Sequence, residues 1–227
     1  MKTLQLKLIL ISALTALSIP ATFAQEMNFF VTSAGSGQGG NLGGLAGADA
    51  RCQALASVAG AGDKTWHAYL STQGMNAVNA RDRIGTGPWY NANGDMIARN
   101  LDELHNEDDN RLSVRTALDE HGRPVPYVGL DDDGTPLPIE LQITPNVEHD
   151  ALTGSDANGM AYPAGNDMTC NNWTSSDEGT AMLGHIDRRT LGPGVSPWAT
   201  AHPSAGCSQQ ALINTGGTGR YYCFAID

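Results

Sequence analysis

The side chains of this chain that could transfer protons or bind a metal include six histidines, which are scattered along the sequence. They are His67, His105, His121, His149, His185 and His202. None lies in an H-E-x-x-H zinc motif, and the chain has no G-x-S-x-G nucleophile elbow. His185 and Asp187 stand two residues apart, so on a strand they would share one face. We therefore expect no enzyme and no catalytic residues; the alternative is a hydrolase that uses His185 and Asp187 as an acid–base pair.

A second set of side chains could bind a carbohydrate. Trp173 and Trp198 lie towards the two ends of the segment between Cys170 and Cys207, and aromatic faces beside fixed amides suit the C–H and hydroxyl groups of a sugar. The predicted ligand-binding residues are Asn171, Asn172, Trp173, His185, Asp187, Trp198 and His202. Large aromatic side chains are usually buried packing residues. The alternative is therefore that both tryptophans belong to the core and that the polar residues form turns.

One acidic turn is the remaining candidate for ion binding. Residues 131–134, Asp-Asp-Asp-Gly, lack the alternating spacing and the distal glutamate of an EF-hand calcium loop. An acidic turn is the simpler interpretation. We expect no metal and no other cofactor, and calcium at Asp131 and Asp133 is the alternative.

The elements that must position these residues begin with residues 45–72, the most regular stretch. Apolar and small residues recur there at spacings of three and four, which predicts one helix face. They are Leu45, Ala48, Cys52, Leu55, Ala56 and Ala59. Residues 66–71 then predict a strand in which Trp66, Ala68 and Leu70 face one side of a sheet.

The other expected elements are shorter. The sequence predicts a hairpin around Ala92-Asn93-Gly94 and a short helix near residues 101–105 that is capped by Asn100. Strands are expected at residues 28–32 and 219–226, and a strand or the end of one at residues 170–174. Residues from about 106 to 165 predict a long, loop-rich excursion, the kind of segment in which a scaffold often carries its binding function.

Residues 1–24 have the pattern of a signal peptide. Two lysines precede a mostly apolar run over residues 8–19, and small residues suit cleavage near Ala24. The apolar run is short for a membrane span. We therefore expect a mature chain of residues 25–227 that forms one domain, has no membrane span and is secreted or periplasmic.

The charge of the chain limits its partners. Its formal net charge is -11, and loss of the two leader lysines makes it -13. Like charges repel at long range, so nucleic acids and heparin-like polyanions are not expected partners.

Four cysteines remain in the expected mature chain: Cys52, Cys170, Cys207 and Cys223. An even number in an oxidising compartment predicts two disulfides. The absence of a C-x-x-C pair argues against a zinc knuckle or a thioredoxin-like redox site. Three pairings are open from the residues alone.

The order of these features resembles the C-type lectin-like fold, and more closely its endostatin-related branch and secreted bacterial lectin-like proteins. The residues that carry the resemblance are Gly47–Gln53, Trp66–Ser71, Cys170–Thr174 followed by Gly184, and the ending from Cys207 to Cys223. The resemblance covers residues 28–224. It implies an α+β domain with a mixed, mostly antiparallel sheet, one main N-terminal helix and long loops. It also implies nested disulfides, Cys52–Cys223 and Cys170–Cys207.

The chain departs from the sugar-binding members of that fold. Those proteins hold calcium with Glu-Pro-Asn or Gln-Pro-Asp and with Trp-Asn-Asp, whereas the nearest counterpart here is Trp198-Ala199-Thr200. Alanine supplies no side-chain oxygen for calcium. We therefore expect an exported binding module that recognises a carbohydrate or a cell-surface protein without the calcium–sugar triplets. A purely structural envelope protein is a further alternative.

Overall fold

A computed structural model describes residues 26–125, 148–188 and 196–227. The expected signal peptide and the two calcium candidates, Asp131 and Asp133, lie outside these ranges. The elements in chain order are β1 (Phe29–Val31), α1 (Gly44–Val58), β2 (Trp66–Ala68), the 3-10 helix η1 (Ala80–Arg83), β3 (Trp89–Tyr90), β4 (Met96–Ala98), α2 (Leu101–Leu104), β5 (Asp150–Leu152), α3 (Cys170–Trp173), β6 (Met182–His185), β7 (His202–Pro203), α4 (Gln209–Thr215) and β8 (Gly217–Ala225).

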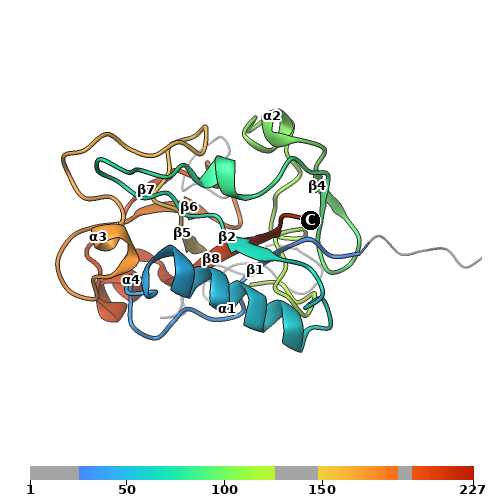
Figure 1. Cartoon of the computed structure of the whole chain (residues 1–227), viewed down its shortest axis with the longest axis horizontal. Helices are drawn as coiled ribbons and strands as arrows, with labels where there is room; N and C mark the ends of the chain where they lie inside the picture. The colour runs from blue at the N-terminus through green and yellow to red at the C-terminus, as the bar shows by residue number, and fades with distance from the viewer. Residues whose placement is uncertain (1–25, 126–147, 189–195) are drawn as a thin grey trace, which may run out of the picture.

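The terminal strand β8 is the centre of the main sheet (Figure 1). Its C-terminal half pairs antiparallel with β1 and with β2, and its N-terminal half pairs parallel with β5. Beyond β5 the sheet continues antiparallel through β6 and β7, and β3 and β4 form a separate two-stranded ribbon. This arrangement confirms the expected α+β class with a mixed, mostly antiparallel sheet.

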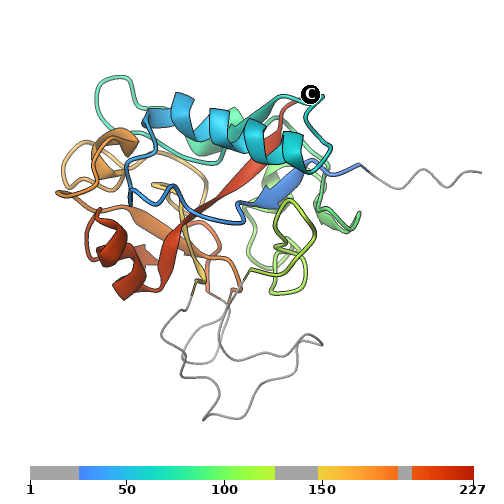
Figure 2. The ribbon, with the colours of Figure 1, turned by 90° about the horizontal axis from the view of Figure 1, so that it is seen from below.

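Both faces of this sheet are buried. Successive residues of a strand point to opposite faces, so Tyr222 and Phe224 join one core cluster while Tyr221 and Cys223 join the other. The first cluster includes Phe29, Tyr69, Trp89 and Trp198. The second includes Phe30, Trp66, Leu70 and Trp173, and it is covered by α1, which packs beside β2 and crosses β8 in Figure 2.

Two disulfides fasten the fold, Cys52–Cys223 and Cys170–Cys207, with Cα atoms 5.7 Å and 5.6 Å apart. The nested pairing is therefore confirmed, and the first bridge ties α1 to β8. Both bonds fit an extracellular or periplasmic protein. Within the described ranges, no helix combines the length and apolar composition that a membrane span requires.

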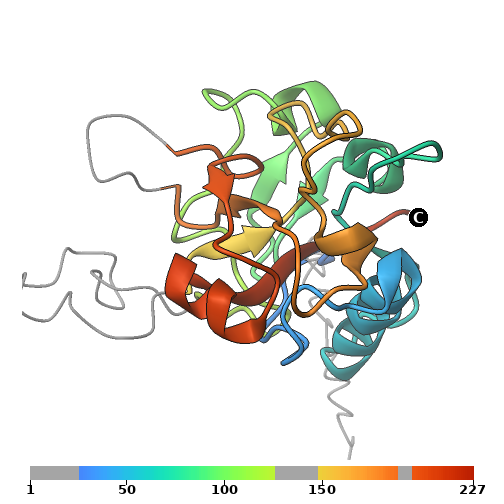
Figure 3. The same cartoon turned by 90° about the vertical axis from the view of Figure 1, so that its left-hand side faces the viewer.

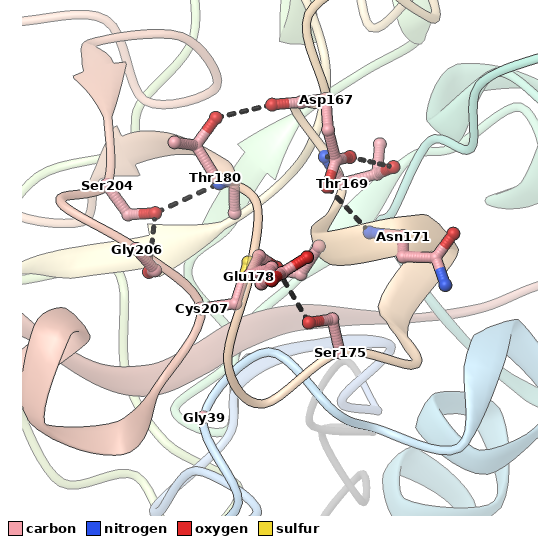
Figure 4. The surroundings of a disulfide bond; sticks show 12 residues. Gly39, Asp167, Thr169, Asn171, Ser175, Glu178, Thr180, Ser204, Gly206 and Cys207 are labelled. Atoms are coloured by element: carbon pink, nitrogen blue, oxygen red, sulfur yellow. Dashed lines mark hydrogen bonds between the residues drawn. A yellow bond between two sulfur atoms is a disulfide. The ribbon is translucent and has the colours of Figure 1, made fainter.

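The expected strand at residues 170–174 is wrong. Cys170, Asn171, Asn172 and Trp173 all have positive φ, from 46° to 66°, so α3 is a left-handed turn. This conformation costs L-residues roughly 1–2 kcal/mol each. The turn is held by the carboxylate of Asp167, which accepts hydrogen bonds from the backbone N–H of Thr169 and of Asn171 at 2.9 and 2.8 Å (Figure 4). The disulfide at Cys170 adds a covalent constraint.

The loop-rich excursion expected around residues 106–165 contains a strand from the interior of the sheet. β5 lies between β8 and β6, and it has only three residues. So few residues produce no recognisable alternation. Figure 3 shows β5, β6 and β7 at one end of the molecule, beside α4, which sequence reasoning also missed. Membership of the C-type lectin-like fold stays a prediction.

Candidate metal centre

Three histidines and two aspartates meet at this end of the sheet. His149 and Asp150 stand at the start of β5, and the antiparallel register of β5 and β6 places Asp150 opposite His185. The pairing of β6 with β7 brings His202 opposite Leu183, next to the same site. Asp187 follows two residues after the end of β6. Short strands from distant parts of the chain therefore deliver these side chains to one place.

Asp150 is the centre of the cluster. Its Oδ1 atom lies 3.3 Å from Nε2 of His149, 3.4 Å from Nε2 of His185 and 3.8 Å from Nε2 of His202. The ligand atoms of His149, Asp150 and His185 all lie within 4.8 Å of one another. Two imidazole nitrogens and one carboxylate oxygen thus converge on one small volume.

The histidine rings are oriented by neighbouring groups. Nδ1 of His149 lies 3.3 Å from Oδ2 of Asp187, and the His149 and His185 rings stack with centroids 4.3 Å apart. The turn after β6 folds back onto His149, because the Ile186 N–H donates to the His149 carbonyl at 2.7 Å. This turn thereby brings Asp187 to the outer nitrogen of His149 and leaves its Nε2 directed at Asp150.

Burial makes Asp150 unusual. The residue is 2% exposed, and neither of its carboxylate oxygens has a hydrogen-bond partner within the described part of the chain. Loss of solvation raises the pKa of Asp150 to about 6; His149 and His202 lower it, and the charge of Asp187 raises it further. A buried carboxylate without hydrogen bonds is costly. A cation among these donor atoms would compensate its charge.

Gly216, which follows α4, lies directly beside the Asp150 carboxylate and the His149 ring. Its φ is 128°, and a Cβ atom there would lie 3.1 Å from Oδ2 of Asp150 and 3.2 Å from Nε2 of His149. Contacts at that distance are tighter than ordinary van der Waals contacts. The backbone therefore approaches the cluster at a position where only glycine leaves the Asp150 carboxylate and His149 Nε2 undisturbed.

Two buried arginines fix the segments that carry the donors. Arg220 of β8 forms an ion pair with Glu148, the residue before His149, and also donates to the Thr32 carbonyl. Arg188 pairs with Glu107 at 2.7 Å and follows directly after Asp187. Each ion pair is placed one residue along the chain from a member of the cluster, so each restrains the backbone of the site.

The structure separates the residues of the predicted carbohydrate site. His185, Asp187 and His202 join the cluster. Trp173 and Trp198 have no exposed surface, and their indole N–H groups donate to the carbonyls of Ser71 and Leu104. The expected aromatic floor is therefore absent, because a fully buried ring offers no face to a sugar. Both tryptophans are core residues, as the alternative interpretation held.

Asn171 and Asn172 lie on α3. The side chain of Asn172 accepts from the Gln73 N–H at 2.7 Å and donates to the Gln73 carbonyl at 3.1 Å. The Asn172 amide thus links α3 to the segment at Gln73 with one accepted and one donated hydrogen bond, as a paired strand residue would. Asn171 is exposed. Its backbone N–H donates to the Asp167 carboxylate, and its side-chain amide donates to the Thr174 hydroxyl. These contacts support the left-handed turn.

Sequence reasoning missed two members of the cluster. His149 was one histidine among six, and Asp150 was assigned to a loop. The one available signal is the adjacent His-Asp pair, directly before the apolar Ala151-Leu152. The expected His185–Asp187 pair does lie in the cluster, but Asp187 stands beside His149 and His185 beside Asp150.

No protein-family model matches this sequence, and no curated protein shows significant similarity to it. The residues of the cluster are therefore the feature from which a function can be inferred.

Proposed function

We propose that the protein binds one divalent transition-metal ion, zinc in the first instance, through His149 Nε2, Asp150 Oδ1 and His185 Nε2. The observation that carries the proposal is Asp150, a buried carboxylate that has no hydrogen bond to any described residue and whose neighbours are imidazole nitrogens. Imidazole suits zinc and other late transition metals, whereas calcium and magnesium prefer oxygen donors.

The spacing of the donors supports a tetrahedral ion. Zinc binds histidine nitrogen at about 2.0–2.1 Å and carboxylate oxygen at about 2.0–2.2 Å, so neighbouring ligands of a tetrahedron lie roughly 3.3–3.5 Å apart. The distances from Asp150 Oδ1 to His149 and His185 are 3.3 and 3.4 Å. Two of the three donor–donor distances thus match the separation that zinc would require.

The contact of the His149 ring nitrogen that would not bind the metal fits the same assignment. A metal-bound histidine usually gives its other ring N–H to a carboxylate or a carbonyl, which fixes the tautomer and the ring orientation. Asp187 stands in that relation to His149 at 3.3 Å. This changes the role foreseen for Asp187, which acts in the proposal by orienting a ligand instead of transferring protons.

Calorimetric titration of the mature chain, after removal of metals with a chelator, tests the proposal. We expect one zinc ion per chain in the wild type and losses of at least about 100-fold in affinity for Asp150→Asn and His185→Ala, since each removes a metal ligand. His121→Ala is the matched control, because His121 is an exposed histidine outside the cluster. Equal zinc affinity in all four proteins would refute the assignment.

Recognition of a carbohydrate or a cell-surface protein by this exported chain stays a prediction. If the prediction holds, the ligand would bind at the metal centre, since the cluster holds three of the seven residues first expected to bind a ligand. A glycan array probed with zinc-loaded and with metal-free protein addresses it directly. Binding that depends on zinc would support recognition at the centre.

A further inference from the structure

We propose that the ion held by His149, Asp150 and His185 keeps its fourth coordination position open for an exogenous oxygen ligand. In this proposal His202 is not a metal ligand; it accepts a hydrogen bond from the oxygen ligand. The inference rests on the proposed metal binding and adds the class of molecule that the centre takes.

The position of His202 differs from that of the other donors. Its Nε2 lies 3.8 Å from Asp150 Oδ1 but only 2.9 Å from His185 Nε2. The first distance is longer and the second shorter than the roughly 3.3–3.5 Å edge of a tetrahedral zinc site. His202 also lies outside the group of three residues whose ligand atoms are all within 4.8 Å of one another. An ion seated among those three would therefore have its fourth position beside His202.

The hydrogen bonds of His202 fit the role of an acceptor. Nδ1 lies 3.3 Å from the carbonyl oxygen of Pro203, which can only accept, so this contact places the ring proton on Nδ1. Nε2 then carries a lone pair, which in the metal-free protein accepts a hydrogen bond from the Nε2–H of His185. A metal ion on His185 Nε2 requires the His185 tautomer whose proton is on Nδ1, and His202 Nε2 is then left facing the coordination sphere.

Exposure indicates where an external ligand could enter. The side chains of Asp150, His185 and His149 are 1%, 12% and 22% exposed, whereas that of His202 is 37% exposed. The cluster is thus closed behind Asp150 and most open at His202. A solvent-side position on zinc holds water in the absence of another ligand, and catalytic zinc sites keep such a position.

These features select oxygen ligands that carry a hydrogen. The ion attracts the oxygen lone pair, and the acceptor nitrogen of His202 requires an O–H or N–H next to it. Water satisfies both conditions, as do hydroxamates and singly protonated phosphates. Small hydroxylated oxygen donors are therefore the ligand class that we assign to the centre.

Cobalt spectroscopy on the mature chain tests this inference, with acetohydroxamate as the probe. Cobalt(II) replaces zinc in such sites and reports its coordination number by visible absorption. We expect acetohydroxamate to convert the cobalt spectrum of the wild type saturably from four-coordinate to five-coordinate. His202→Ala should bind cobalt within about threefold of the wild type but bind acetohydroxamate about tenfold more weakly, because one hydrogen bond is lost. His202→Gln, whose amide oxygen can accept a hydrogen bond, should recover part of that loss, and His121→Ala should match the wild type.

The outcomes separate the two proposals. If His202→Ala and His202→Gln lose cobalt as His185→Ala does, and acetohydroxamate leaves the wild-type spectrum unchanged, then His202 is the fourth ligand and the open position is refuted. If the wild type binds neither cobalt nor zinc, the metal-binding proposal fails and this one fails with it.

Discussion

Replacement of Asp150 by asparagine separates the cost of this residue to the metal-free fold from its value to the metal-loaded protein. The two side chains have nearly the same shape, but asparagine carries no charge. Burial raises the pKa of Asp150 from 3.8 to about 6. One pKa unit corresponds to about 1.4 kcal/mol. Ionised Asp150 therefore destabilises the metal-free fold by about 3 kcal/mol at neutral pH.

The sign of this effect follows from proton binding. Below about pH 4 the carboxyl is protonated in both the folded and the unfolded chain, so it causes no penalty. Between about pH 4 and 6 the folded chain retains a proton that the unfolded chain has lost, and stability falls as the pH rises. Above about pH 6 the full penalty is present. We expect Asp150→Asn to unfold at similar denaturant to the wild type near pH 4.

Urea unfolding in the presence of a chelator at a series of pH values measures this difference. At pH 7.5 we expect the variant to be more stable by about 3 kcal/mol. In a chain of this size, that difference corresponds to a rise of roughly 6–12 °C in the thermal unfolding midpoint. Zinc should close most of this gap, since a ligand at 100 times its Kd adds about 2.7 kcal/mol to a protein that binds it. Asp177→Asn, at an exposed site, is the control.

One result would refute the reasoning. If Asp150→Asn is less stable than the wild type at pH 7.5 without metal, then the carboxylate stabilises the fold through the neighbouring imidazoles. Asp150 would in that case need no metal ion for its compensation.

Three further predictions concern the surroundings of the centre and the fold. Asp187→Asn should weaken zinc binding by about 10–100-fold in calorimetry without lowering the metal-free thermal midpoint, because it removes the group that orients His149; unchanged affinity would contradict this. Gly216→Ala should weaken zinc binding and cost roughly 1–3 kcal/mol in urea unfolding, because φ is 128° there and the added Cβ approaches the Asp150 carboxylate and His149 Nε2; wild-type behaviour would exclude the proposed close approach. Replacing Cys52 and Cys223 by alanine should destabilise the fold by about 2–5 kcal/mol in the same assay, and a smaller loss would show that α1 is held by packing alone.

The elements that could be predicted from the sequence are those with local signals. The spacing of Ala48, Cys52 and Ala56 predicted the buried face of α1, and all three are buried. Asn100 was expected to cap α2, and its side chain accepts from the Glu103 N–H at 2.9 Å. These signals are reliable because helix periodicity and capping involve residues within one or two turns.

The elements that escaped prediction have few residues or depend on distant ones. β5, β6 and β7 have three, four and two residues, too few for a pattern to stand out. The left-handed turn of α3 depends on the carboxylate of Asp167 and on the bond from Cys170 to Cys207. The strand expected there was therefore wrong, because these constraints come from outside the segment.

The sequence by itself determined the donor types and one part of the site, the spacing of His185 and Asp187. Only the tertiary structure decided that Asp150 stands opposite His185, because the pairing of β5 with β6 is a long-range choice that neither strand encodes alone. It also decided that Asp150 is buried and that Trp173 and Trp198 are not available to a ligand. Charge compensation for a buried carboxylate is a property of its surroundings, so the candidate metal centre becomes visible only when those surroundings are in place.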